Sequence, residues 1–363
     1  MQTEDKRLDY VDMAKGLGML SVVWGHIMLV GWSNALVYGF HMPLFFFLSG
    51  MMFRKDKYNT LKSLLNRRFS TLIRPYLIIS FVTWSIWAVY NFVLHNPVDS
   101  YIKPLLETFI AQGSGGYLVH NVPLWFVSCL LFVEICYFFV CKNRIVINIA
   151  ICLLFALIGW AMIQPNDFFD FTQLPWNIEA GFSAIIFYAL GNIFSQNVGH
   201  QALVDFVNKR CLFSIIAVVL FTVLLFIGAN YNGHVSLGSN RLGKNVFLFY
   251  AVAMCGIIST ITFSILLAIL KEKKYLYKEI SFVQWIGCNS FYFMATHVPV
   301  KGFVTVIVAK YFKLESYRLV QVNMWYSLIS FVISIAVTAF VVYLINRSIV
   351  HYKSRKNVIQ GAQ

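Results

Sequence analysis

Long apolar runs recur from one end of this 363-residue chain to the other. A helix needs about 20 apolar residues to cross the roughly 30 Å hydrocarbon core of a bilayer. Hydrophobic residues make up 59% of the chain and charged residues only 12%, whereas a soluble domain has about a quarter charged residues. We therefore expect an all-α polytopic membrane protein.

The runs predict about ten transmembrane helices. They fall near residues 10–31, 35–53, 75–94, 123–141, 145–163, 178–195, 211–228, 246–270, 280–298 and 319–345. The sequence stays apolar from Val298 to Ala309, after the ninth run, so this stretch is either a re-entrant segment or an extension of the ninth span. No internal repeat is apparent, and the connecting loops are too short for a folded domain. We predict a single transmembrane domain over residues 1–350 and a short basic cytoplasmic tail over residues 351–363.

The positive charges give this arrangement an orientation. Twenty-one of the 29 lysines and arginines fall at the termini and the even-numbered junctions, against seven on the opposite side. The positive-inside rule then places both termini in the cytoplasm. The net charge of +14 is mostly this bias, and no basic surface with base-stacking aromatics indicates nucleic-acid binding. The first apolar run has no small-residue cleavage site, so we interpret it as a retained span.

The first helix carries ionisable residues that a bilayer rarely tolerates. Lys15 and His26 are eleven residues apart, so they lie on one face of the helix about 16 Å apart. Asp12 is one turn before Lys15 and is placed to neutralise it. Lys15 could instead extend to the cytoplasmic headgroups, and His26 could serve an interhelical hydrogen bond. Intramembrane ionisable groups usually mark a polar site, however.

Two further histidines are predicted at the depth of His26. His41 is about six residues into the second span from its outer end, and His297 is about seventeen residues into the ninth span from its inner end. Three histidines at one depth would make a wet, proton-accepting pocket. We expect no metal there, because no carboxylate or cysteine is predicted beside them at ligand spacing. The seven scattered cysteines form no Cys-x-x-Cys pair and read as buried apolar residues.

Basic residues gather at the inner end of the third span. Arg67 and Arg74 are two turns apart, and Arg68 follows Arg67. With Lys15 they would form a ring suited to phosphates or a nucleotide, because Arg binds such groups bidentately. The alternative is an ordinary cluster that only sets topology. The charges thus suggest a phosphate-bearing molecule at the cytoplasmic mouth and a base near the outer face.

Two carboxylates lie inside predicted spans. Glu134 is in the middle of the fourth span, so we expect it to pair with a basic or histidine side chain or to be protonated. Glu179 is near the outer start of the sixth span, where it would serve an acceptor site or would reflect the preference of helix N-termini for acidic residues.

These residues resemble a known family. The pattern of Asp12, Lys15 and His26 resembles the first-helix signature of the acyltransferase-3 membrane O-acyltransferases. Residues 40–50 (FHMPLFFFLSG) resemble their second helix, particularly in the branch related to fucose 4-O-acetylases. Further blocks follow in the family's order: Arg67-Arg68…Arg74-Pro75-Tyr76, residues 123–127 (PLWFV) with Glu134, residues 187–191 (FYALG), and residues 286–290 (IGCNS) with Tyr292 and His297.

The chain departs from the family pattern in two places. Lys15 replaces the arginine of many members, which keeps the charge but loses bidentate phosphate geometry. No extracellular esterase-like domain follows the membrane domain, so an acyl relay, if the reaction needs one, would lie on a separate protein.

The resemblance implies a reaction across the bacterial cytoplasmic (inner) membrane. Acetyl-CoA or another short acyl-CoA would donate from the cytoplasm to a hydroxyl of a cell-surface polysaccharide or lipid-linked sugar on the outer side. The implied roles are acyl-CoA binding by Lys15, Arg67, Arg68 and Arg74, catalysis by His26, His41, His297 and Glu134, and acceptor binding by Glu179, Trp125 and Tyr292. We predict His26 as the general base, because a neutral imidazole can accept a hydroxyl proton.

Two other classes of function remain open. A transporter or flippase for a lipid-linked glycan would use a similar polar core, although such proteins often contain internal repeats. A glycan polymerase or glycosyltransferase usually needs acidic residues or a large outer loop, whereas the outer carboxylates here are scattered. We expect the protein to be surrounded by membrane lipid. The sequence does not identify the acceptor sugar, and it does not say whether the protein forms a homo-oligomer.

Overall fold

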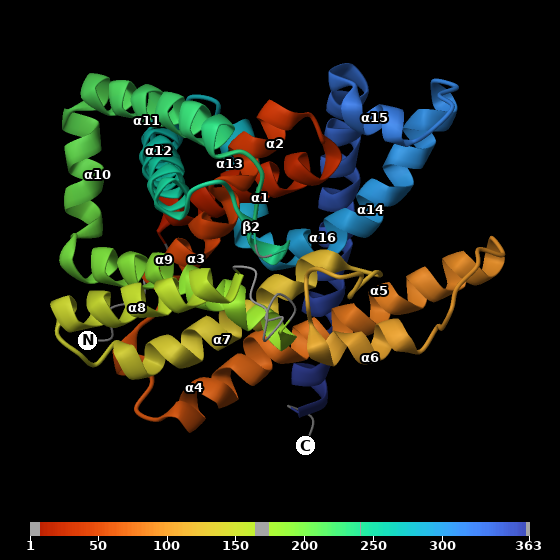
Figure 1. Ribbon diagram of the computed structural model, residues 1–363, viewed down its shortest axis with the longest axis horizontal. Helices are drawn as coiled ribbons and strands as arrows, with labels where there is room; N and C mark the ends of the chain where they lie inside the picture. Colours follow the sequence, from red (N-terminus) through yellow and green to blue (C-terminus); the bar gives the residue numbers. More distant parts are fainter. Residues whose placement is uncertain (1–7, 164–173, 240, 361–363) are drawn as a thin grey trace.

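The apolar runs form helices in the computed structural model, which describes residues 8–163, 174–239 and 241–360 (Figure 1). The helices of the first half are α1 (Asp9–Ile27), α2 (Gly31–Tyr38), α3 (His41–Met51), α4 (Leu61–Arg68), α5 (Arg74–Val93), α6 (Lys103–Ile110), α7 (Trp125–Val140) and α8 (Ile145–Ile163). Those of the second half are α9 (Ile178–Asn197), α10 (His200–Lys209), α11 (Cys211–Asn232), α12 (Val246–Glu272), α13 (Tyr277–Cys288), α14 (Ser290–Tyr311), α15 (Arg318–Val322) and α16 (Met324–Gln360).

Short elements join these helices. Single helical turns precede α7 and α9, and a π-helical turn, Phe69–Ile73, joins α4 to α5 without a break. The described strands are β1 (Val235–Ser236) and β2 (Arg241–Leu242), which pair as an antiparallel hairpin between α11 and α12. The protein is therefore an all-α polytopic membrane protein, as predicted from the hydropathy of the chain.

Among the described residues, eight helical segments are long and apolar enough to cross a membrane. They are Leu61–Val93, Val122–Val140, Ile145–Ile163, Pro175–Asn197, Cys211–Asn232, Val246–Glu272, Ser290–Tyr311 and Met324–His351. The sequence predicts about ten spans, and the difference lies in the first two. The first is α1, which is less apolar because of its acidic and basic residues, and the second is divided into α2 and α3 at Gly39. The predicted cytoplasmic location of the termini stays a prediction.

The ninth expected span is also divided. Residues 280–298 belong to α13 and α14, which meet at Asn289, and α14 continues through Pro299 to Tyr311. The apolar sequence that follows the expected span is thus an extension of a helix. At the other end of the chain, α16 continues to Gln360, so the backbone of the predicted tail is helical as far as it is described.

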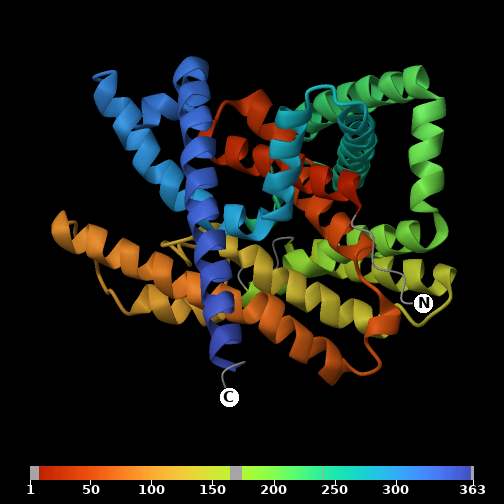
Figure 2. The same cartoon turned by 180° about the vertical axis from the view of Figure 1, so that it is seen from behind.

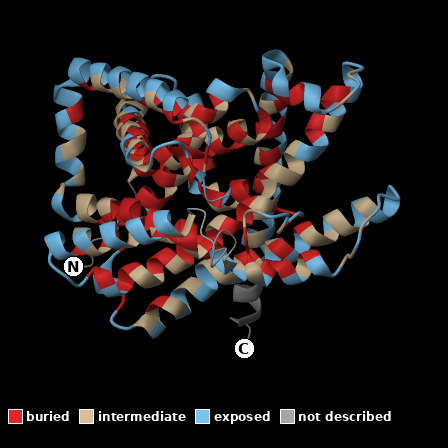
Figure 3. Ribbon diagram, viewed as in Figure 1, coloured by how far each residue is buried: buried red, intermediate tan, exposed pale blue. Residues whose placement is uncertain are grey.

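The polar first helix lies inside the protein. α1 packs against α3, α12, α13, α14 and α16, and twelve of its nineteen residues are buried. Figures 2 and 3 show α1 enclosed, with buried residues concentrated around it and exposed faces on the outer helices. Two thirds (67%) of the apolar window of α7 and of α9 is buried, against 11% for α11. The outer helices present apolar faces to lipid, whereas α1 faces protein and can carry charge.

Glycines permit the closest helix contacts around this core. A Cβ atom on Gly50 of α3 would meet the backbone of Tyr188 in α9, and a Cβ atom on Gly191 of α9 would meet the backbone of Phe47 in α3. Small residues at such contacts let two helix backbones approach closely, which is a common source of helix association in membranes.

We expect Gly191→Ala to destabilise the protein by about 1–3 kcal/mol, because backbone atoms must move to accept the methyl group. Gly302→Ala, also within a helix, is the matched control. An added Cβ at Gly302 meets no described atom within 4 Å, so only the higher helix propensity of alanine acts there, by about 1 kcal/mol in the stabilising direction. In detergent, the thermal unfolding midpoint of Gly302→Ala should be higher than that of Gly191→Ala. Equal midpoints would contradict the packing argument.

Candidate active site

Three histidines from three helices meet in the core. His26 is at the end of α1, His41 begins α3 and His297 is on α14. The ring centroids of His26 and His297 are 5.2 Å apart. Tyr38, the last residue of α2, lies between the other pair, with its ring centroid 6.4 Å from His26 and 5.0 Å from His41. The structure thus brings together the three histidines that depth arithmetic places at one level.

Backbone carbonyls set the tautomer of two of these rings. Nδ1 of His41 donates to the Val37 carbonyl at 2.7 Å, and Nδ1 of His297 donates to the Phe293 carbonyl at 3.0 Å. A carbonyl oxygen can only accept, so the proton is on Nδ1 and the neutral ring keeps a lone pair on Nε2. Nε2 of His297 is buried and has no hydrogen-bond partner among the described residues. Both rings are therefore oriented as bases.

A cavity of about 400 Å³ joins two of the histidines to Lys15. Lys15, His26 and His41 all line it, and Trp125 of α7 and Ser290 at the start of α14 contribute to its wall. Its volume falls in the range of small-molecule sites. The charged and the histidine parts of the wall are separated by eleven residues of α1, or about 16 Å. One cavity thus contains both the cation and the base that the sequence predicts at opposite ends of α1.

The Lys15 part of the wall carries a paired cation. Nζ of Lys15 is 3.7 Å from Oδ1 of Asp12. The Asp12 side chain is buried, and its other oxygen, Oδ2, accepts from the Cys288 thiol at 3.5 Å. The expected pairing of Asp12 with Lys15 is observed. The pair lets a lysine lie within the core at a smaller desolvation cost than that of an isolated charge.

A hydrogen-bonded layer packs against Trp125, which forms part of the cavity wall. Gly113 and Gly238 both pack directly on the Trp125 ring. The Gly113 N–H donates to Asn177, whose amide donates in turn to the Gly238 carbonyl at 3.1 Å. Glu179 is fully buried behind this layer and accepts from Gln112 at 3.1 Å. Glu179 thus supports the wall that Trp125 forms and does not itself line the cavity.

Glu134 belongs to an ion pair outside the cavity lining. Nε of Arg68 is 2.5 Å from Oε2 of Glu134, and a terminal guanidinium nitrogen donates to Oε1 at 2.7 Å. The Tyr188 hydroxyl donates to the same carboxylate at 3.2 Å. The expected pairing of Glu134 with a basic side chain is observed: the guanidinium lies against both carboxylate oxygens and donates a charge-assisted hydrogen bond to Oε1.

The remaining predicted residues lie outside the cavity lining as well. Arg67 and Arg74 are exposed, while Leu72, on the same helical segment, lines the cavity. Tyr292 is half-buried, and its ring packs on Phe291, which is a lining residue. Of the three arginines, Arg68 is therefore paired with Glu134, whereas the side chains of Arg67 and Arg74 are exposed.

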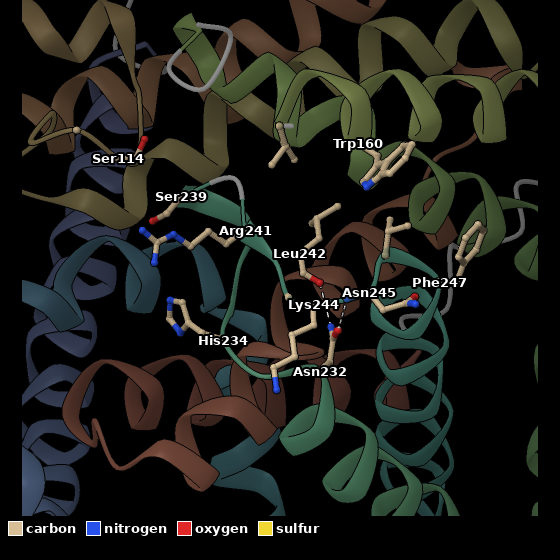
Figure 4. Close-up of a pocket in the computed structure, with 14 residues that line it drawn as sticks. Ser114, Trp160, Asn232, His234, Ser239, Arg241, Leu242, Lys244, Asn245 and Phe247 are labelled. Atoms are coloured by element: carbon tan, nitrogen blue, oxygen red, sulfur yellow. Dashed lines mark hydrogen bonds between the residues drawn. The ribbon is translucent and has the colours of Figure 1, made fainter. Parts of the chain in front are cut away.

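The structure adds residues that the sequence pattern does not indicate. A second, more open cavity of about 1140 Å³ is formed by the hairpin and its neighbours (Figure 4), and Ser239 lines both cavities. His234 lines the second cavity, and its ring centroid is 6.4 Å from that of Tyr38. Tyr38 is at the break between α2 and α3, and His234 is in the loop after α11. Neither position belongs to a regular helical pattern that would indicate a site from the sequence.

The site occurs within a recognisable domain. A family model for the acyltransferase domain of acyltransferase-3 proteins matches residues 8–346. The chain belongs to the acyltransferase-3 family. As a member of this family it is a membrane acyltransferase, and the match includes every residue of both cavities. No curated protein and no solved structure matched the chain. The resemblance to the fucose 4-O-acetylase branch stays a prediction.

Proposed function

We propose that this acyltransferase moves an acetyl or other short acyl group from cytoplasmic acyl-CoA to a hydroxyl of a cell-surface or lipid-linked sugar on the outer side of a bacterial inner membrane. The observation that carries the proposal is the single cavity whose wall contains both Lys15 and two of the three histidines. A donor arm and an acceptor hydroxyl can meet only where one cavity is open to both.

In this mechanism the acceptor oxygen attacks the thioester carbonyl carbon while His26 takes the hydroxyl proton. The carbon–sulfur bond then breaks, an ester and the CoA thiolate are formed, and the thiolate receives the proton as free CoA leaves. A positioned base contributes about 10²- to 10⁴-fold to such a step. His41 lines the same cavity with its Nε2 lone pair, so it orients the acceptor or returns the proton, and His297 supports His26 from behind.

The donor is held in two parts. The acyl-pantetheine arm lies in the cavity beside Lys15, and the nucleotide phosphates bind outside it at Arg67 and Arg74. This division is supported by the exposure of those two guanidiniums and by the commitment of Arg68 to Glu134. Arg binds phosphate bidentately.

The reaction is tested with purified protein in lipid nanodiscs. Free thiol released from acetyl-CoA and acetyl ester formed on extracted, de-O-acetylated surface glycan are measured together. The proposal requires that both products appear in equal amounts. Transport of the glycan without release of thiol would instead indicate the flippase alternative.

The donor site gives a prediction of its own. Replacing Arg67 and Arg74 together by Gln is expected to raise KM for acetyl-CoA about tenfold or more, because two charge-assisted contacts are lost. KM for acetyl-pantetheine, which lacks the nucleotide phosphates, should not change. Lys62→Gln, which removes an exposed cation from the start of α4, is the matched control. An equal loss with both donors would contradict this placement of the phosphates.

A further inference from the structure

The described lining of the second cavity carries charge of one sign. It is lined by fourteen residues from α8, α11, α12, the hairpin and the loop that contains Ser114 (Figure 4). Arg241 and Lys244 are the cations in this lining, and none of the described lining residues is a carboxylate. Within the described parts of the chain, neither cation has an ion-pair partner within 4.0 Å. A concave surface lined by one sign of charge concentrates ligands of the opposite sign.

Hydrogen bonds hold the described backbone on either side of these cations. Asn232, at the end of α11, is 1% exposed. Its side-chain amide donates to the Leu242 carbonyl at 2.9 Å, and its side-chain oxygen accepts from the Asn245 N–H at 2.8 Å. Pairing of Ser236 with Arg241 closes the hairpin. Arg241 and Lys244 are thus fixed at their backbones, which lowers the ordering cost of binding.

The second cavity adjoins the histidine site. Ser239 is common to the linings of both cavities. The ring of His234 contacts Tyr38, and the ring of Tyr38 contacts His41. Burial and the nearby Arg241 guanidinium lower the pKa of His234, so its imidazole is neutral near pH 7 and can both donate and accept hydrogen bonds. A ligand held in the second cavity can therefore present a hydroxyl to the first.

The position of the cations across the membrane is also informative. The predicted orientation places the loop between α11 and α12 on the outer side, where lysine and arginine are depleted by the positive-inside rule. Arg241 and Lys244 therefore have no topological reason to be there. Arginine forms bidentate contacts with carboxylates and phosphates alike.

We propose that the second cavity is the acceptor subsite and that it takes an anionic glycan, whose carboxylate or phosphate is bound by Arg241 and Lys244. This inference rests on the function proposed above and specifies its acceptor class. The negative charge has two possible sources, an acidic sugar of the glycan or the phosphate of a lipid-linked or phosphate-bearing glycan.

The test uses one glycan in three forms. Surface glycan from cells that lack the gene is offered to the nanodisc enzyme untreated, after chemical reduction of its carboxylates to alcohols, and after removal of its phosphates. We expect one treatment to raise KM for the acceptor about tenfold, and that treatment identifies the source of the charge. Equal KM values for all three forms would overturn the inference.

Variants supply the second part of the test. Replacing Arg241 and Lys244 together by Gln should raise KM for the untreated glycan about tenfold and leave KM for acetyl-CoA unchanged. Lys313→Gln removes an exposed cation outside both cavities and is the matched control. The wild-type KM should also rise with ionic strength because exposed charges are screened, and that dependence should be lost in the double variant. A double variant that behaves like Lys313→Gln would overturn the inference.

Failure of the inference and failure of the proposed function are distinguishable. Thiol release from acetyl-CoA together with equal acetylation of all three glycan forms contradicts only the anionic acceptor. Absence of thiol release and of acetyl ester with every form contradicts the acyl transfer itself. Size-exclusion profiles and thermal midpoints of both variants should match those of the wild type, which shows that the measured changes are not caused by misfolding.

Discussion

Replacing His26 by alanine is expected to lower kcat for acyl transfer by about 10²- to 10⁴-fold, which is the usual contribution of a positioned general base. KM for acetyl-CoA should change little, because the nucleotide phosphates bind elsewhere in the proposed mechanism. The measurement is the steady-state release of CoA thiol with saturating glycan. His26 is half-buried, faces the cavity and has His297 beside it.

The matched control for this variant is Leu29→Ala. Leu29 is two residues beyond the end of α1, is 51% exposed and does not line the cavity, so its truncation changes neither the cavity nor the core. If His26→Ala folds normally and acylates at the wild-type rate, the mechanism is wrong. Wild-type activity in His26→Ala, together with a loss of kcat of about 10²- to 10⁴-fold in His41→Ala, would assign the role of base to His41. His41 also lines the cavity, and its Nδ1 proton is committed to a carbonyl, so its Nε2 is free to accept a proton.

Replacing Glu134 by alanine is expected to destabilise the protein by about 3 kcal/mol, near the lower end of the range for breaking a buried ion pair. The guanidinium of Arg68 would lose both of its contacts with the carboxylate, and the Tyr188 hydroxyl would lose its acceptor. The lower end applies because the Arg68 side chain is 22% exposed and retains some water. Thermal unfolding in detergent measures the effect.

A double-mutant cycle separates the pair from its members. Arg68→Met leaves the Glu134 carboxylate buried without its cation, Glu134→Leu leaves the Arg68 guanidinium without its anion, and the combination of these two substitutions removes both charges. We expect the double variant to recover most of the stability lost in either single variant. Arg67→Ala, at an exposed position, is the control. Strictly additive losses would show that the pair contributes nothing as a pair. Folded Glu134→Ala protein with no thiol release would instead favour a catalytic role.

Local sequence rules predict much of this molecule. Apolar length locates most of the spans, and helical spacing gives the pairing of Asp12 with Lys15. Depth arithmetic brings His26, His41 and His297 to one level because rise per residue is fixed in a helix. What these rules do not contain is the path of the chain between helices. The break at Gly39 that directs Tyr38 toward the histidines is of this kind.

Pairings over long separations show the same limit. Arg68 and Glu134 are 66 residues apart, so the sequence indicates that Glu134 needs a basic partner but not which one. The second cavity depends on a short hairpin held by Asn232, and two-residue strands leave no alternating pattern to read. The burial of α1 is likewise a property of its neighbours and not of its own hydropathy.

The enclosure of α1 has a consequence for how the protein is made. A helix with Asp9, Asp12, Lys15 and His26 is a poor substrate for release into lipid by itself, because each charged residue at membrane depth is costly. Its principal neighbour, α13, is synthesised more than 250 residues later. Because α1 is synthesised well before α13, it completes its burial late in biogenesis. Assembly of the histidine site must await the C-terminal third of the chain, and an N-terminal fragment cannot contain it.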